Sequence, residues 1–380
     1  MQRKDEVELT EELLDLHRRK SACLVEQVTT SSIGAYLDTE RFKSERHRIF
    51  RRFPQPVAHW SELPEVGSFL RRDFAGLPVL ITRDGEGVAH AFLNVCRHRG
   101  TRLVDAERGC RHRFSCPYHA WTYSNQGDLI GVPHEALGFS ELDRQDFGLK
   151  RLGCAERYGW IWLSADDETP DVEPFLAGLG ADFDGLAGAD HALLHQDERV
   201  CAANWKIIVE GGIEAYHFRV AHRETIAPYF LDNLSTFREF GLHLRSILAR
   251  RSLPELAEQP KDTWRLRDHA QVLYSIFPLN QLLVQSDHIA WIQSEPIDAA
   301  STRIRISTLA PRDRIATDDD LRHWARNHDI TMRTLGEDFD IAESIQSGLA
   351  SGANEVLTFG RFEGALAAFN REVDALLENA

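Results

Sequence analysis

Two short segments in the first half of the chain carry paired cysteine and histidine residues: CRHRGTRL (residues 96–103) and SCPYHAWTY (residues 115–123). The first contains a Cys-x-His couple and the second a Cys-x2-His couple. The four residues with metal-binding side chains are Cys96, His98, Cys116 and His119. Short apolar runs flank both segments, so we expect each couple on a loop at the end of a strand. Two such loops can hold one metal centre between them.

The ligand types predict an iron–sulfur cluster. A Rieske [2Fe–2S] cluster takes two thiolates on one iron and two imidazoles on the other, and each couple supplies one of each. A structural zinc site uses the same residue types but usually pairs Cys with Cys and His with His, and it is the alternative. Cys110 lies between the couples, and we expect it to be a small buried residue rather than a ligand.

The pattern around these segments indicates an α+β protein with two domains. Over residues 45–165, short apolar runs alternate with turns such as Asp84-Gly85 and Gln126-Gly127, which predicts an all-β domain. The acidic segment 166–174 carries two prolines and predicts a boundary. Residues 1–44 and 166–380 would form the second domain, an antiparallel sheet with flanking helices. Its expected elements are helices at 204–222, 318–349 (with a break near Asp329) and 359–377, and three strands within 271–311.

A second group of metal-binding side chains follows in this domain: Glu214, His217 and His222. Two histidines and a carboxylate are the ligand set that holds Fe(II) with positions open for O2 and substrate. Glu214 and His217 would share one helix face. His217 and His222 would point about 140° apart on a regular helix, so we expect a π-bulge or an unwound turn between them.

Both groups together resemble the α subunits of ring-hydroxylating oxygenases, which are Rieske-type non-heme iron enzymes. The family's catalytic domain has a helix-grip-like fold. The resemblance implies that His217 and His222 bind a mononuclear Fe(II). It also implies that Glu214 is not a ligand but bridges His217 to His119 of a neighbouring subunit, in a homotrimer. The third ligand would come from LGEDFDIAESIQSGL (335–349), where we choose Asp338; the competing carboxylates are Glu337 and Asp340.

The function implied by the resemblance is that of an oxygenase component. A separate NAD(P)H-dependent reductase, with or without a ferredoxin, would supply electrons through the cluster. With O2, the enzyme would hydroxylate or oxidatively demethylate a small quaternary amine or aromatic compound. Aromatic side chains that could line the substrate site are Tyr216, Phe218, Tyr274, Phe277 and Trp291. The alternative is a Rieske electron-transfer protein whose second domain only binds a ligand.

Composition limits the partners. The formal charge of −15 over 380 residues disfavours nucleic acid and anionic membranes. The N-terminus is charged, and no stretch approaches the roughly 20 apolar residues of a membrane span. The six cysteines are scattered, unlike a disulfide framework, so we expect a cytoplasmic protein.

Overall fold

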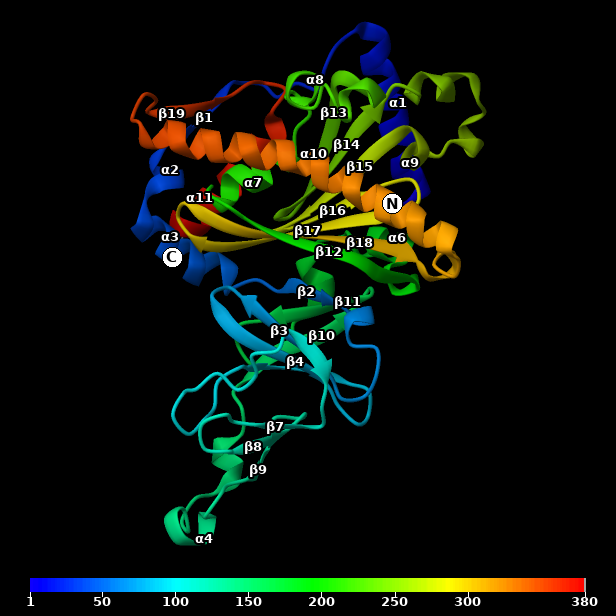
Figure 1. The fold of residues 1–380 in the computed structure, drawn as a ribbon. Coiled ribbons are helices and arrows are strands. Elements are labelled where there is room, and N and C mark those ends of the chain that lie inside the picture. The colour runs from blue at the N-terminus through cyan, green and yellow to red at the C-terminus, as the bar shows by residue number, and fades with distance from the viewer. Residues whose placement is uncertain (379–380) are drawn as a thin grey trace. The chain divides into compact units, whose positions relative to one another are not determined.

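The computed structural model describes residues 1–378. The chain divides into two compact units, Arg51–Phe175 and a unit made of Met1–Phe50 with Leu176–Ala380 (Figure 1). The first unit is built mainly from strands, and the second combines one large sheet with helices. The α+β class predicted from the sequence is therefore confirmed.

The Arg51–Phe175 unit contains a seven-stranded antiparallel sheet in the order β2-β11-β10-β5-β4-β3-β6, and a small sheet β7-β8-β9. The strands are β2 (Gln55–His59), β3 (Ser68–Phe74), β4 (Leu77–Arg83), β5 (Ala89–Leu93), β6 (Arg108–Cys110), β7 (Arg113–Ser115), β8 (Thr122–Ser124), β9 (Leu129–Gly131), β10 (Arg151–Arg157) and β11 (Trp160–Ser164). Two short helices, α4 (Glu135–Gly138) and α5 (Val172–Phe175), complete it.

Both predicted hairpin turns are present in this unit. The Asp84 carboxylate accepts hydrogen bonds from the backbone N–H groups of Glu86 and Val88, each at 2.9 Å, which closes the turn between β4 and β5. Between β8 and β9 the N–H of Gly127, at φ +89°, donates to the carbonyl of Ser124 at 3.1 Å. These turns join the strands that carry the two Cys/His loops.

The second unit is built on a seven-stranded antiparallel sheet in the order β12-β18-β17-β16-β15-β14-β13. Its strands are β12 (His191–Cys201), β13 (Phe230–Phe240), β14 (His243–Arg250), β15 (Ala270–Ile276), β16 (Asn280–Val284), β17 (Ile289–Asp298) and β18 (Ser301–Pro311). The region predicted to hold three strands therefore holds four. The chain reverses at Phe277-Pro278, so one apparent apolar run forms both β15 and β16.

Helices cover this sheet. They are α1 (Arg3–Arg19), α2 (Gly34–Leu37), α3 (Thr39–Glu45), α6 (Gly180–Leu186), α7 (Trp205–Gly212), α8 (Phe218–Ala221), α9 (Leu266–His269), α10 (Asp318–Ala350) and α11 (Gly364–Glu378). Figure 1 shows α10 lying along the sheet, and it packs on β12, β18 and α7. A core of Ile207, Ile208, Ile292 and Phe339 joins α7 and α10 to the sheet.

Two of the helix boundaries predicted for the C-terminal part of the chain are wrong. α10 runs without a break through Asp329, because the neighbouring His328 is buried and bonds to Thr308 and Asp197 from the sheet. Residue 359 does not begin a helix: Phe359 ends β19 (Val356–Phe359), which pairs with β1 (Thr29–Ser32). Within residues 1–378, no helix is both long and apolar enough to cross a bilayer.

Candidate metal centres and substrate cavity

The two Cys/His loops have the same backbone design. In the first, the N–H of Cys96 donates to the carbonyl of Thr101 at 2.8 Å, and the N–H of Gly100 donates to the carbonyl of Cys96 at 3.0 Å. In the second, the N–H of Cys116 donates to the carbonyl of Trp121 at 2.8 Å, and the N–H of Ala120 donates to the carbonyl of Cys116 at 3.0 Å. Gly100 and Ala120 both adopt positive φ, +77° and +57°, at the equivalent turn. Each loop therefore holds its cysteine at a fixed corner.

The donor set of these loops fits a cluster shared between two irons. Cys96 and Cys116 are buried, and the rings of His98 and His119 lie 4.7 Å apart between centroids. The Nδ1 atom of His98 is buried and has no hydrogen-bond partner among the described residues, as expected of an atom that binds a metal.

Neighbouring side chains adapt the loops to a metal centre. The ring of His98 stacks on the ring of Trp121, with 4.9 Å between their centroids and an angle of 9° between their planes. Burial, together with His119 and Arg99, lowers the pKa of His98, which favours the neutral imidazole that a metal requires. The hydroxyl of Tyr123 lies 3.5 Å from the sulfur of Cys96 and accepts a hydrogen bond from the N–H of Arg97 at 3.0 Å.

Cys110 differs from the expectation of a buried residue. It is exposed at the end of β6, at the rim of the sheet, where its thiol lies 3.5 Å from the carbonyl of Val66. Burial at that position is limited because β6 is an edge strand whose three residues are all exposed.

The second group of candidate ligands lies around a broken helix. α7 ends at Gly212, residues 213–217 are not helical, and α8 is a single turn. His217 directly precedes α8 and His222 directly follows it. The chain therefore unwinds before His217, not between the two histidines as predicted, and Glu214 and His217 do not share a helix face. The pair Gly211-Gly212 explains the early end, because glycine is a poor helix former.

Three ligand atoms converge at this break. The Nε2 atoms of His217 and His222 lie 3.1 Å apart, and Oδ1 of Asp338 lies 3.4 Å and 3.0 Å from them. They form the one group of three or more such side chains within 4.8 Å among the described residues. Ligands about 2.1 Å from an ion and at right angles to each other are about 3 Å apart, so the spacing fits one cation.

The opposite ring nitrogens of both histidines face carboxylates. Nδ1 of His217 contacts Oε1 of Glu214, and Nδ1 of His222 donates to Oε2 of Glu337 at 2.7 Å. The same oxygen of Glu337 accepts a hydrogen bond from Thr225 at 2.7 Å. Such contacts fix the tautomer and the orientation of a metal-binding imidazole.

The competing carboxylates are therefore placed apart from the three ligand atoms. Glu337 stands behind His222, on the side away from Asp338. Asp340 is exposed and pairs with Arg199 at 2.7 Å. Of the three acidic residues weighed as third ligand, the structure brings only Asp338 to the Nε2 atoms of both histidines.

Electrostatics at the three ligands favour a cation. Burial opposes the charged imidazolium of His217, but the Asp338 and Glu214 carboxylates outweigh it and raise its pKa to about 10. Burial also opposes ionisation of Asp338, yet the two histidines hold its pKa below its ordinary value. The site attracts positive charge, and a divalent metal ion would compete with protons for it.

α10 is tied to the start of α7, which helps fix the distance between Asp338 and the histidines. The side-chain oxygen of Gln346 accepts a hydrogen bond from the backbone N–H of Asn204 at 2.9 Å. The side chain of Asn204 in turn caps α7 by accepting from the N–H of Lys206 at 3.0 Å. All three of these residues are buried.

A cavity of about 80 Å³, here called the inner cavity, has His217, His222 and Asp338 in its wall. The rest of the wall is uncharged and consists of aliphatic residues, two glycines, two threonines, one phenylalanine and three glutamines. The glutamines are Gln271, Gln281 and Gln285. The inner cavity therefore offers a small, largely uncharged space beside the three candidate ligands.

Most of the aromatic residues expected to line the substrate site lie elsewhere. Only Phe218 contributes to the wall of the inner cavity. Tyr216 is exposed, whereas Tyr274, Phe277 and Trp291 are buried in the core of the sheet. Tyr274 and Trp291 lie on strands and Phe277 lies in the turn after β15, so one phenylalanine ring, rather than an aromatic cage, lines the inner cavity.

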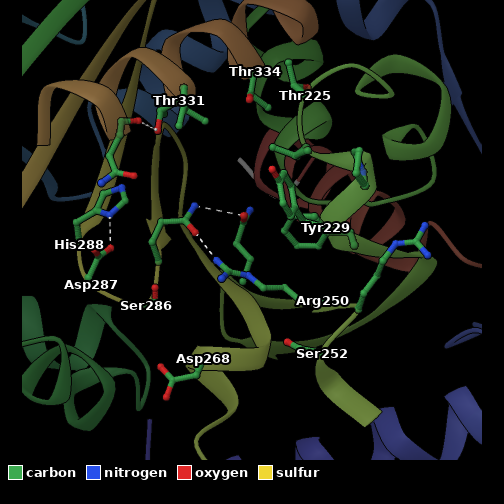
Figure 2. Close-up of a pocket in the computed structure, with 18 of the residues that line it drawn as sticks. Thr225, Tyr229, Arg250, Ser252, Asp268, Ser286, Asp287, His288, Thr331 and Thr334 are labelled. Carbon is green, nitrogen blue, oxygen red and sulfur yellow. Dashed lines mark hydrogen bonds and ion pairs between the residues drawn. The ribbon is translucent and has the colours of Figure 1, made fainter. Parts of the chain in front are cut away.

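A larger cavity of about 800 Å³, here called the outer cavity, adjoins the inner one (Figure 2). It does not include the three ligands, but it shares six wall residues with the inner cavity: Ile226, Gln271, Gln285, Ile330, Thr331 and Thr334. Its own wall is strongly charged and includes Arg250, Asp268 and Asp287. The two cavities together offer a path from the surface to the ligands.

Comparison with known protein families places this arrangement. Residues 189–379, half of the chain, match the family described as "Ring hydroxylating alpha subunit (catalytic domain)". The chain belongs to this family. Residues 53–140 of this ring-hydroxylating alpha subunit match the "Rieske [2Fe-2S] domain", so the family resemblance seen in the sequence is confirmed.

Three similar proteins illustrate the relationship. The glycine betaine monooxygenase oxygenase subunit of Pseudomonas aeruginosa is 34% identical over 191 residues, which is 50% of this chain and 44% of that protein. The carnitine monooxygenase oxygenase subunit of Acinetobacter baumannii is 28% identical over 83% of this chain and 84% of that protein. The quaternary ammonium Rieske monooxygenase CntA, crystallised with an inhibitor, superposes with a TM-score of 0.78 at 25% identity, covering 92% and 96% of the two chains.

Several residues of the ring-hydroxylating alpha subunit's site were missed in the sequence. Thr225 supports Glu337, and Gln271, Gln281 and Gln285 line the inner cavity. A usable signal was present for two of them, because Gln271 and Gln281 interrupt the apolar sequences of β15 and β16. Buried polar side chains in a strand need a hydrogen-bonding or binding role.

Proposed function

We propose that this chain is the oxygenase component of a Rieske non-heme iron oxygenase. In this proposal Cys96, His98, Cys116 and His119 hold the [2Fe–2S] cluster, and His217, His222 and Asp338 hold the iron. The observation that carries the proposal is the convergence of these last three side chains on the wall of the inner cavity. When bound, the iron would supply O2 activation and the cluster would supply electrons.

The protein's own residues prepare this site. Glu337, held by Thr225, orients His222, and Glu214 orients His217. The uncharged wall of the inner cavity displaces water and positions the substrate carbon beside the ligands. The alternative, an electron carrier with a passive binding domain, gives no reason for two histidines and an aspartate to meet at a cavity.

The partners form part of the same proposal. Electrons would come from NAD(P)H through a reductase, directly or through a ferredoxin. We assign the cluster to residues 45–165 and the iron to residues 1–44 and 166–380. In a homotrimer in the cytoplasm, Glu214 would link His217 to His119 of a neighbouring subunit. Support for the role of Glu214 comes from its contact with the outer nitrogen of His217.

The substrate class follows from the relatives and the family. Two relatives carry names that refer to the quaternary amines glycine betaine and carnitine, and the family name refers to ring hydroxylation. We therefore propose hydroxylation or oxidative demethylation of a small quaternary amine or aromatic compound.

A reductase-coupled assay tests this function. The purified protein, a compatible reductase, NADH and a substrate panel should consume O2 and release formaldehyde or a hydroxylated ring. Asp338→Ala should abolish product. Glu214→Ala should keep the cluster spectrum and, at saturating iron, the iron as well, but lose product, because the electron path is cut. Product formation at the wild-type rate in Asp338→Ala would contradict the proposed iron site.

A further inference from the structure

The outer cavity contains a guanidinium that forms no ion pair within 4.0 Å with a carboxylate of the described residues. Arg250 ends β14 and lies in the cavity wall (Figure 2). Its Nη2 donates a hydrogen bond to Oε1 of Gln285 at 2.8 Å, and its guanidinium lies 6.0 Å from the centre of the Phe230 ring. A guanidinium has five N–H donors, so most of its donor capacity remains available to a ligand.

The position of Arg250 links the two cavities. Gln285 and Gln271 line both of them, and Nε2 of Gln285 donates to Oε1 of Gln271 at 3.3 Å. A chain of hydrogen bonds therefore runs from Arg250 through Gln285 to Gln271, at one end of the neighbouring strands β14, β15 and β16. A ligand that reaches from the three metal ligands into the outer cavity would meet this guanidinium.

We propose that the substrate carries a carboxylate that pairs with Arg250 while its reactive end lies in the inner cavity. This inference rests on the proposed oxygenase function and specifies its substrate class. The planar fork of a guanidinium matches a carboxylate through two parallel hydrogen bonds.

The surrounding charges favour a carboxylate over a phosphate. Burial lowers the pKa of Arg250, although the charges of Asp268 and Asp287 oppose this change. Asp287 is already engaged, because His288 and His323 each contact it at 2.8 Å. A second guanidinium, that of Arg267, bonds to the backbone carbonyl of Gln285 and adds positive charge. Besides Arg250, Arg251 and Arg333, the wall of the outer cavity carries the acidic residues Glu224, Glu255, Asp268 and Asp287, so an anion with one charge would be repelled less than an anion with two.

The inner cavity complements this assignment. Its wall carries no charged side chain besides the three ligands, and Phe218 is its one aromatic ring. The recognition of charge is thus placed in the outer cavity, away from the carbon to be oxidised. Binding energy gained from the carboxylate would orient the reactive end, as remote substrate groups do in other enzymes.

Binding to matched pairs of ligands tests the proposal on the holoenzyme. The probes are a fixed panel of aromatic and N-methylated carboxylic acids, among them anthranilate and glycine betaine, each compared with its carboxamide by calorimetry. We expect at least one acid to bind the wild type about tenfold or more tightly than its amide, as for a charge-assisted bidentate pair. Arg250→Gln should remove this preference, and Arg250→Lys should keep part of it.

The neighbouring Arg251 provides the control. It lines the same cavity and is exposed, so Arg251→Gln should retain the preference for the acid. The proposal is overturned if no acid of the panel binds more tightly than its amide, if Arg250→Gln keeps the preference, or if Arg251→Gln loses it equally.

The same experiment separates this proposal from the proposed function. Binding needs neither O2 nor electrons, and the visible spectrum and iron content of each variant report folding and loading. Acid preference in a protein that fails to hold the third iron would reject the oxygenase and keep the anion site. A protein that holds all three irons but shows no preference for the acid would support the oxygenase and reject the anion site.

Discussion

Each histidine of the proposed iron site uses its two ring nitrogens for different tasks. The Nε2 atoms of His217 and His222 face Asp338, and their Nδ1 atoms face Glu214 and Glu337. Glu337 differs from Glu214 in its support, because it is anchored by Thr225. It is a positioning residue, which acts on the metal through His222.

Removal of Glu337 should weaken iron binding without affecting the cluster. In Glu337→Ala, Nδ1 of the buried His222 loses its acceptor, and affinities fall about 10- to 100-fold when such supports are removed. Competition with a chelator measures this loss, while the visible spectrum should stay unchanged. Asp340→Ala, on the exposed side of α10, is the control and should retain wild-type affinity. Equal iron affinity in both variants would show that Glu337 does not support His222.

A buried carboxyl group away from the metal ligands makes stability depend on pH. Glu210 on α7 accepts hydrogen bonds from Tyr36 at 2.7 Å and Asn370 at 2.8 Å. Burial raises its pKa from 4.5 to about 7, although these two bonds oppose the change. Below pH 4.5 the group is protonated in the folded and unfolded states. As the pH rises through 7, the folded state must hold a buried charge and loses stability.

The variant Glu210→Gln should remove this pH dependence. Between pH 5 and 8 the unfolding free energy of the wild type should fall relative to that of the variant, by up to about 3 kcal/mol at about 1.4 kcal/mol per pKa unit. Urea unfolding at several pH values measures the difference. Parallel profiles for the two proteins would mean that Glu210 has an ordinary pKa.

The residues of the site could be predicted to different degrees. The cluster couples are contiguous in sequence, so their chemistry is visible without a fold. Asp338 and Glu337 are adjacent, and only the rotation of α10 against α7 decides which one faces both histidines. Arg250 and Gln285 become neighbours through strand pairing, which no local pattern reveals.

At the scale of elements, the end of α7 controls the geometry of the iron site. The predicted helix through residue 222 was wrong because Gly211 and Gly212 end it. The two glycines have different surroundings. A Cβ atom on Gly212 would lie 2.7 Å from the side-chain nitrogen and oxygen of Gln281, whereas one on Gly211 would meet nothing within 4 Å.

Alanine at these two positions should therefore change the unfolding free energy in different ways. Gly212→Ala must displace Gln281, which lines the inner cavity and donates to the carbonyl of Val209, and should lower the unfolding free energy by about 1–3 kcal/mol. Gly211→Ala should leave it equal or raise it by up to about 1 kcal/mol. Denaturant unfolding of the wild type and of both variants measures these changes in unfolding free energy. A stability loss in Gly211→Ala as large as in Gly212→Ala would rule out this packing argument.

Long-range contacts also explain why one predicted break in a helix is absent. Asn327, His328 and Asp329 are weak helix formers, and the sequence favoured a boundary there. In the structure His328 is buried and bonds to Thr308 on β18 and Asp197 on β12. These contacts hold α10 straight along the sheet and carry Asp338 to the histidines.

At the scale of the whole molecule, the two candidate metal-binding groups belong to two compact units. The Cys/His couples lie in the unit Arg51–Phe175, and His217, His222 and Asp338 lie in the other unit. The α+β class was predictable because the strand pattern changes near residue 175. The number of strands in the large sheet was not, since the reversal at Phe277-Pro278 interrupts an apolar run without the usual polar turn residues.

The number of iron atoms per chain tests the central claim most directly. We predict about three irons and two acid-labile sulfides in the wild type, because a [2Fe–2S] cluster accounts for two irons. Asp338→Ala should hold about two irons with an unchanged visible spectrum, since its fold retains the cluster loops. Two irons in the wild type, or three in Asp338→Ala, would contradict a separate iron on His217, His222 and Asp338.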